Sequence, residues 1–201
     1  GMYRIALFLF ALLLAFTSFA QRGKMANPNI SATVIVNEYT SLTNSVSAGA
    51  TSITVANSGL NTNARFPGNL TQGDLLMVIQ MQGVLTNATP FINRSEPNDT
   101  TWGTILNYNN CGRYEFVEVL SVPNNSTINL SCPLSNSYKD TGKVQVIRVP
   151  RYASLTINGA GTIQAQPWNG TTGGIVAIEV LGNTTINGQI NVNGQGFRGG
   201  A

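Results

Sequence analysis

A repeat in the last third of the chain restricts the fold more strongly than any other feature of the sequence. Residues 155–172 and 184–201 align without a gap at an offset of 29 residues. The matched pairs include Thr156 with Thr185, Ile157 with Ile186, Ile163 with Val192, Gln166 with Gln195, Trp168 with Phe197 and Gly170 with Gly199. A period of roughly 20–50 residues is typical of solenoids, in which each repeat buries its apolar side chains against the next.

Short β-prone runs separated by Asn-Gly turns indicate a β-helix rather than a helical solenoid. We expect one coil to hold three short strands, near 155–158, 162–166 and 175–181. The alternative is a chance alignment, because Asn, Gly and Thr are abundant throughout the chain.

The composition supports an all-β fold. Only 9% of the 201 residues are charged, while 24 are Asn, 35 are Ser or Thr and 21 are Gly. These residue types are poor helix formers and common in turns. The chain has no His, which excludes His-based catalytic triads and His metal sites. The net charge is +3 and the basic residues are scattered, so the sequence predicts no nucleic-acid partner.

Residues 41–150 are predicted to form a small β-barrel or sandwich-like domain, followed by a short β-helix over 151–201. Turn residues separate β-prone runs in this part of the chain. The runs lie at 53–55, 75–81, 114–122, 127–130 and 144–149. An insertion rich in Asn and Pro, at 84–113, is expected to form a surface loop.

Residues 46–150 resemble a small β-barrel module of secreted and phage-tail proteins. The resemblance rests on residues 50–55, Gly73 and Asp74, Tyr114 and Glu115, Val119, Val122, 128–130, Pro133 and Leu134, Tyr138 and Val144.

The N-terminus has the layout of a secretory signal peptide over residues 1–20. Arg4 is followed by an apolar run from 5 to 16, and Ser18 and Ala20 precede Gln21 at the expected cleavage point. A retained hydrophobic helix is the alternative. Residues 21–40 are predicted to be a flexible arm with a strand that is donated to another molecule.

The C-terminal part resembles the Gly-rich β-helix starts of large Bacteroidota surface proteins, many of them exported by the type IX pathway. The matching residues are those at 173–176 and 190–194. This resemblance implies an extracellular, cell-surface location.

Cys111 and Cys132 are the two cysteines of the chain, and export would place them in an oxidising compartment. They are predicted to form a disulfide that links the insertion to the 114–131 hairpin. Two unrelated thiols are the alternative.

No catalytic pair of carboxylates stands out. Glu115 and Glu118 are three residues apart on a predicted strand, so a regular strand sends them to opposite faces. Asp74 follows a Gly and is expected to cap a turn. The sequence predicts a protein that is not an enzyme and needs no cofactor or metal.

Two kinds of surface site are candidates. Trp102, Tyr108 and Tyr114 lie in or beside the insertion and are candidates for stacking on sugar rings. Candidate glycosylation sites are Thr100, in a motif that resembles Bacteroidota O-glycosylation, and the Asn-x-Ser/Thr positions Asn29, Asn69, Asn87, Asn93, Asn98, Asn124, Asn125, Asn129, Asn169 and Asn183. Part of this Asn enrichment is explained by turn chemistry.

The predicted function is that of an extracellular structural protein, which assembles head-to-tail into a surface fibre or forms part of an adhesin. The expected partner is a second copy, with strand exchange through residues 21–40 or 184–201. The alternatives are a module that binds surface polysaccharide and a truncated β-helix enzyme that degrades it.

Overall fold

The structure is a computed structural model that describes residues 22–87 and 103–197. Within these residues the regular elements are strands and one short 3-10 helix, so the predicted all-β fold is confirmed. The strands are β1 (Asn29–Ile30), β2 (Thr33–Ile35), β3 (Glu38–Ser41), β4 (Ser52–Thr54), β5 (Leu75–Gln80), β6 (Leu85–Thr86), β7 (Ile105–Asn107), β8 (Tyr114–Asn124), β9 (Thr127–Leu130), β10 (Val144–Val149), β11 (Arg151–Tyr152), β12 (Leu155–Ile157), β13 (Thr162–Gln164), β14 (Glu179–Val180), β15 (Thr184–Ile186) and β16 (Gln189–Ile190).

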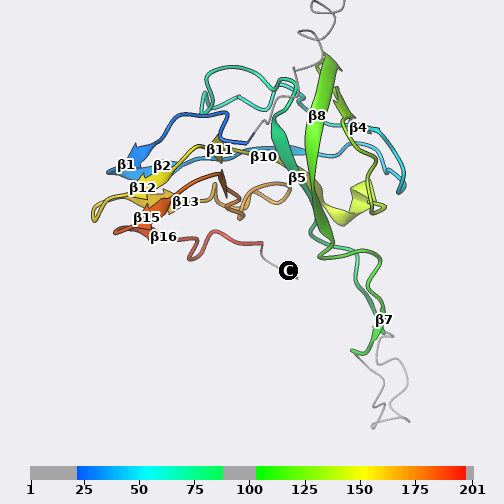
Figure 1. Ribbon diagram of the computed structural model, residues 1–201. Helices are drawn as coiled ribbons and strands as arrows, with labels where there is room; N and C mark the ends of the chain where they lie inside the picture. The colour runs from blue at the N-terminus through cyan, green and yellow to red at the C-terminus, as the bar shows by residue number, and fades with distance from the viewer. Residues whose placement is uncertain (1–21, 88–102, 198–201) are drawn as a thin grey trace, which may run out of the picture.

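A β-helix of three stacked rungs forms one part of the molecule (Figure 1). The first rung consists of Met25, β1 and β2, the second of β11, β12 and β13, and the third of β14, β15 and β16. All pairings between rungs are parallel, as expected for consecutive coils of a solenoid.

The first rung comes from the segment that the sequence predicts to be a flexible arm. β1 pairs with β12 and β2 pairs with β13 of the same chain. Ile30 is buried with Ile157 and Ile163, and Val34 packs against this cluster. The strand is therefore donated within the chain, because a tethered segment reaches an open rung of its own molecule at high effective concentration.

The repeat is visible in the register, with one correction. Ile157 pairs with Ile186, which is the expected offset of 29. Ile163, however, pairs with Ile190 rather than with Val192, which is an offset of 27. The corner at 158–161 is two residues longer than the corner at 187–188. The offset between β13 and β16 is therefore two residues shorter than the offset between β12 and β15. The offset of 29 returns at Trp168 and Phe197, whose rings meet edge to face at 5.2 Å.

A six-stranded antiparallel sheet lies in the chain between the first and second rungs. Its strand order is β3-β10-β5-β8-β9-β4, and it curls so that one face encloses a core. The side chains of this core are Leu42, Ile53, Val55, Leu60, Leu70, Leu76, Val78, Val117, Val119, Ile128, Leu130, Leu134, Tyr138, Val144 and Val146. The alternation along β5, β8 and β10 places every second residue in this core and the others on the outer face.

Residues 173–178 cross the outer face as an extended strap, and two buried amides hold the strap. The amide of Gln145 bonds both the N–H and the carbonyl of Gly173, at 2.9 and 3.1 Å. The amide of Asn37 does the same to Ala177, at 3.1 and 2.7 Å. The predicted strand over 175–181 therefore begins only at Glu179, since side chains replace a neighbouring strand for the strap.

The predicted bridge between Cys111 and Cys132 is not formed in the structure, which has both cysteines as free thiols. Cys111 lies in a turn, where its Sγ donates to the Met81 carbonyl at 3.3 Å. Ser131 donates its N–H to the carbonyl of Glu118, so Cys132 lies beside the middle of β8. Cys111 thus lies in the turn before β8, whereas Cys132 lies in the loop after β9.

The described residues contain no helix that is long and apolar enough to span a membrane. The predicted signal peptide at 1–20 and most of the insertion, 88–102, lie outside the described residues. β6 and β7 pair at the base of the insertion, in the arm that projects from the body in Figure 1.

Tyr152 gives the β-helix a measurable dependence on alkaline pH. Burial in the rung core raises the pKa of Tyr152 to about 12, above the ordinary tyrosine value of about 10. The folded state therefore favours the neutral phenol, and this contribution is complete below pH 10 and is lost as the pH rises toward 12. We expect the free energy of unfolding to fall by roughly 2 kcal/mol across this window. Denaturant melts of wild type and Tyr152→Phe check this, because the variant should lack that part of the decline; parallel curves would contradict it.

Candidate functional site

The outer face of the sheet is covered on one side and open on the other. Tyr39 donates its hydroxyl to the carbonyl of Ile175 at 2.7 Å, which holds the strap over β3 and β10. Ile147 on β10 is consequently 0% exposed, whereas Phe116 on β8 is 50% exposed. The strap ends before it reaches β8. The border between the covered part of the outer face and the exposed part at β8 therefore forms a step in the surface.

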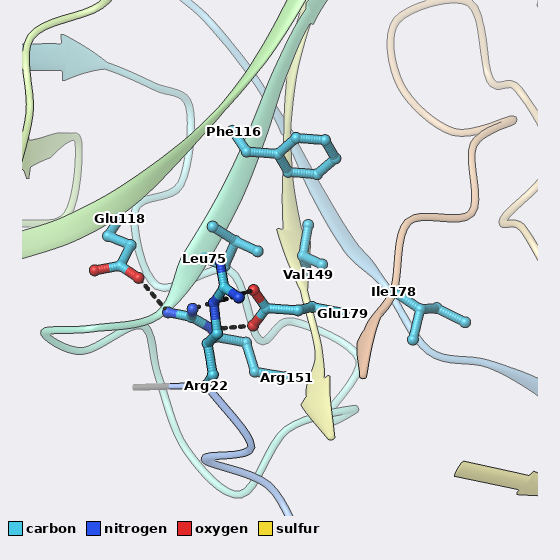
Figure 2. Close-up of a pocket in the computed structure, with 8 residues that line it drawn as sticks. All are labelled: Arg22, Leu75, Phe116, Glu118, Val149, Arg151, Ile178 and Glu179. Carbon is cyan, nitrogen blue, oxygen red and sulfur yellow. Dashed lines mark hydrogen bonds and ion pairs between the residues drawn. The ribbon is translucent and has the colours of Figure 1, made fainter. Parts of the chain in front are cut away.

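A cavity of about 480 Å³ occupies this step (Figure 2). We call it the Phe116 groove and define it by its lining residues, Arg22, Leu75, Phe116, Glu118, Val149, Arg151, Ile178 and Glu179. Leu75 and Val149 form its floor, because they are paired neighbours on the outer face of β5 and β10. Figure 2 places Phe116 on one side of this floor and the four charged residues on the other.

Arg151 organises the charged end of the groove. Its Nη1 donates to Oε1 of Glu118 at 2.6 Å and to the carbonyl of Gly73 at 3.0 Å. Its Nε and Nη2 donate to the two carboxylate oxygens of Glu179. Burial of the Arg151 guanidinium acts to lower its pKa, but the hydrogen bonds and charges of Glu179 and Glu118 outweigh burial and raise the pKa.

Arg22 completes the charged end, with its Nε 3.7 Å from Oε1 of Glu179. The four charged groups therefore balance to zero. Glu118 comes from the sheet, while Arg151 and Glu179 come from neighbouring rungs, so the cluster also joins the sheet to the β-helix.

The structure brings one predicted stacking residue to this groove. Tyr114 is more than half exposed on β8, and its ring meets Phe116 edge to face at 6.2 Å and 85°. Tyr108 is also exposed, and it directly follows β7 in the chain. Trp102 lies outside the described residues.

The predicted separation of Glu115 and Glu118 is confirmed. Glu115 faces the other side of β8, where it accepts hydrogen bonds from the Tyr138 hydroxyl at 3.0 Å and the Ser135 N–H at 2.7 Å. Burial, with the nearby Glu115 charge, raises the pKa of Tyr138. The structure instead gathers Glu118 and Glu179, which the sequence does not pair. Both are bound by one guanidinium, an arrangement of ion-paired carboxylates rather than of a proton donor and a base.

A second cavity, of about 500 Å³, lies beside the turn before β5. There Asp74 accepts hydrogen bonds from Arg148 and Lys24, each at 2.8 Å, and from the Thr71 N–H at 2.9 Å. Asp74 thus caps its turn as predicted. Burial lowers the pKa of Arg148, and its guanidinium lies 4.0 Å from the centre of the Phe66 ring. This cavity is a structural junction between the N-terminal segment and the sheet.

The candidate glycosylation sites are spread over the surface. Within the described residues, the Asn side chains at 29, 69, 124, 125, 169 and 183 are exposed and those at 87 and 129 are partly buried. Asn124 and Asn169 each accept backbone N–H groups two and three residues ahead, which is the turn chemistry expected of Asn. Thr100, Asn93 and Asn98 lie outside the described residues. Glycosylation remains a prediction at all of these positions.

The described ranges contain no group of three or more Cys, Asp or Glu side chains arranged to hold a metal ion.

No protein-family model and no curated protein matches the chain. Solved structures to which it is similar include three phage tailspikes. They are gp49 of Pseudomonas phage LKA1 (16% identity, TM-score 0.32, 68% of this chain), gp61 of Pseudomonas phage phi297 (16%, 0.34, 69%) and gp54 of Acinetobacter baumannii bacteriophage AP22, solved with a capsular saccharide (12%, 0.35, 82%). The matches cover 23%, 21% and 28% of the tailspikes' own length.

Sequence reasoning did not find Phe116, Ile178, Arg151 or Glu179 as members of one site. One signal was present, because β8 carries apolar or aromatic residues on both faces, which is unusual for a strand with a solvated face. Arg151 contacts Glu179 because of the register between β11 and β14, and no local sequence pattern predicts this contact.

Proposed function

We propose that the chain is an extracellular structural protein whose β-helix is extended at its third rung, as part of a surface fibre or adhesin. The signal-peptide layout at 1–20 and the resemblance to Bacteroidota surface proteins support export to the cell surface. The three-rung β-helix supports a role in which further rungs stack on its third rung. The occupant of the third rung in this proposal is a second copy of the chain.

A single observation carries the proposal, and it is the change in burial along the stack. Ile30, Ile157 and Ile186 occupy the same position in successive rungs and are 8%, 0% and 51% exposed. Ile163 and Ile190 repeat the pattern in the neighbouring sheet, at 0% and 46%. The first two rungs thus bury their interior residues, and the third leaves them half exposed.

Covering these side chains would stabilise an assembly. Full burial of an Ile side chain contributes about 1.5–3 kcal/mol, and the open rung presents two such residues together with Val192. Among the described residues, β15 and β16 are edge strands of their sheets, and such edges are a template for further strands.

The two ends of the stack match each other chemically. β1 and β2 are the opposite edges of the same two sheets. Neither the segment of β1 and β2, 26–36, nor the segment of β15 and β16, 184–193, contains a charged residue. Charged side chains commonly protect edge strands from pairing, and these edges lack that protection. Joining the first rung of one copy to the third rung of another keeps the strands parallel and propagates as a filament.

The test uses a charge at the open rung. Ile190→Lys should abolish concentration-dependent assembly of the mature chain in analytical ultracentrifugation, because a buried ammonium at the new interface is strongly unfavourable. Leu120→Lys is the matched control, since Leu120 is equally exposed but lies on β8, and it should assemble like wild type. A wild-type chain that stays monomeric at about 1 mM, the weakest affinity of interest, would overturn the proposal.

Deleting residues 21–40 is not a suitable test, although the sequence suggests it. These residues form the first rung, and Ile30 belongs to the rung core. Their removal would open the β-helix itself, so a loss of assembly would not identify the contact.

A further inference from the structure

We propose that the Phe116 groove is a binding site for an uncharged saccharide, with a pyranose ring stacked against Phe116 and its hydroxyl groups directed to the Arg151–Glu118–Glu179 cluster. The site is separate from the third rung, so it adds a ligand to the structural role proposed above.

The Phe116 groove has the size of a small-ligand site. A cavity of about 480 Å³ lies within the range of small-ligand sites, which is about 300–1,000 Å³. The fold itself creates it, because the amides of Asn37 and Gln145 hold the strap over β10 and leave β8 uncovered. Its walls therefore belong to hydrogen-bonded backbone rather than to a loose loop.

The lining is divided into an apolar side and a polar side. The apolar side consists of Phe116, Leu75, Val149 and Ile178, and Figure 2 shows the Phe116 ring beside Leu75 and Val149, on the side away from the charged residues. An amphipathic ring that has C–H groups on one face and hydroxyl groups at its edge matches this division. A purely aliphatic ligand would bury the charged end without satisfying it, at a cost in free energy.

The balanced charges of the groove disfavour anionic and cationic ligands. Arg22 and Arg151 are balanced by Glu118 and Glu179, and the guanidinium of Arg151 is already bound on three nitrogens. An anionic ligand would meet two carboxylates, and a cationic ligand would meet two guanidinium groups. Hydroxyl groups suit the cluster, because they donate to carboxylate oxygens and accept from N–H groups.

Glu118 is the group best placed to bind a hydroxyl. Its side chain is 42% exposed, and Arg151 engages only its Oε1 among the hydrogen bonds found in the described residues. Tyr114 extends the aromatic surface along β8, since same-face residues of a strand follow at intervals of about 6.6 Å. A saccharide longer than one ring would therefore run along β8 toward the arm.

Titration calorimetry tests the site with neutral hexasaccharides of glucose, mannose, galactose and xylose, and with an oligomer of galacturonic acid. At least one neutral hexasaccharide should bind wild type, and the uronate oligomer should bind more weakly. Phe116→Ala should weaken binding about tenfold, which corresponds to one aromatic contact. Leu120→Ala is the matched control on the same face of β8, outside the groove, and should leave the affinity unchanged.

Two further variants keep the result interpretable. Phe116→Leu retains apolar bulk without an aromatic face, so loss of binding with an unchanged thermal melt separates stacking from folding. The Ile190→Lys chain should bind the saccharide like wild type, which distinguishes failure of this site from failure of the assembly proposal. Binding of the uronate alone, binding that Phe116→Ala does not weaken, or no binding of any neutral oligomer would overturn the inference.

Discussion

Replacing Gly161 with Ala should unfold the β-helix or destabilise it by roughly 3 kcal/mol. Gly161 lies at the corner of the second rung, directly against the first. A Cβ atom there would collide with the carbonyl oxygen of Ile30 and lie 2.9 Å from its carbonyl carbon and 3.0 Å from Cγ2 of Ile157. The obstacle is backbone of a paired strand, which cannot rotate away, so the rungs would have to separate. Thermal melts followed by circular dichroism measure the loss.

Gly159 provides a matched control two residues away in the same corner. A Cβ atom on Gly159 would have no heavy atom within 4 Å. Gly159→Ala should therefore change the melting temperature little. Gly188→Ala tests the same geometry between the second and third rungs, where the added Cβ would meet the carbonyl oxygens of Asn158 and Gly161. Equal melting temperatures for Gly159→Ala and Gly161→Ala would show that the rungs are not in this close contact.

Arg148→Met should destabilise the chain by about 3–5 kcal/mol, the range for removal of one partner of a buried ion pair. The Arg148 side chain is 5% exposed and the Asp74 side chain is 10% exposed. The guanidinium also donates to the carbonyl oxygens of Gly68 at 2.8 Å and Leu60 at 3.3 Å. The variant would leave a buried carboxylate with Lys24 as its remaining cation and would release the loop that these carbonyls anchor.

Urea denaturation measures the free energy of unfolding of Arg148→Met and of the control Arg113→Met. Arg113 is exposed and donates to the Asn136 side chain at 3.2 Å, so its replacement should cost under about 1 kcal/mol. The double variant Asp74→Asn/Arg148→Met should recover part of the loss, because the unpaired carboxylate is then absent. A cost for Arg148→Met no larger than that for Arg113→Met would contradict the buried-pair interpretation.

Local patterns in the sequence predicted most of the sheet. β5, β8, β9 and β10 were expected close to their observed bounds, because alternating apolar residues and flanking turns act over neighbouring positions. The Asn-Gly corners and the offset of 29 likewise predicted rung stacking at Ile157 and Ile186. A difference in corner length defeated the ungapped alignment at Ile163, whose partner is Ile190.

The candidate site was predicted only at its margin. From the sequence, Tyr114 is a candidate for stacking on sugar rings, and in the structure it borders the groove through its contact with Phe116. Arg151 and Glu179 meet because β11 pairs with β14, and Glu118 joins them because β8 pairs with β5. Each of these encounters depends on a register between distant segments, for which the charges themselves carry no pattern.

The sequence by itself determined the all-β class, the positions of most strands of the six-stranded sheet and the existence of a stacked repeat, because period, turn chemistry and propensity are local properties. The tertiary structure alone decided that residues 25–35 supply the first rung and that Asn37 and Gln145 hold the strap. β1 and β12 are separated by more than a hundred residues, and they pair because both bury apolar side chains in one rung core. Such a choice depends on which edges are left open once every other segment has packed, and no stretch of sequence contains that information.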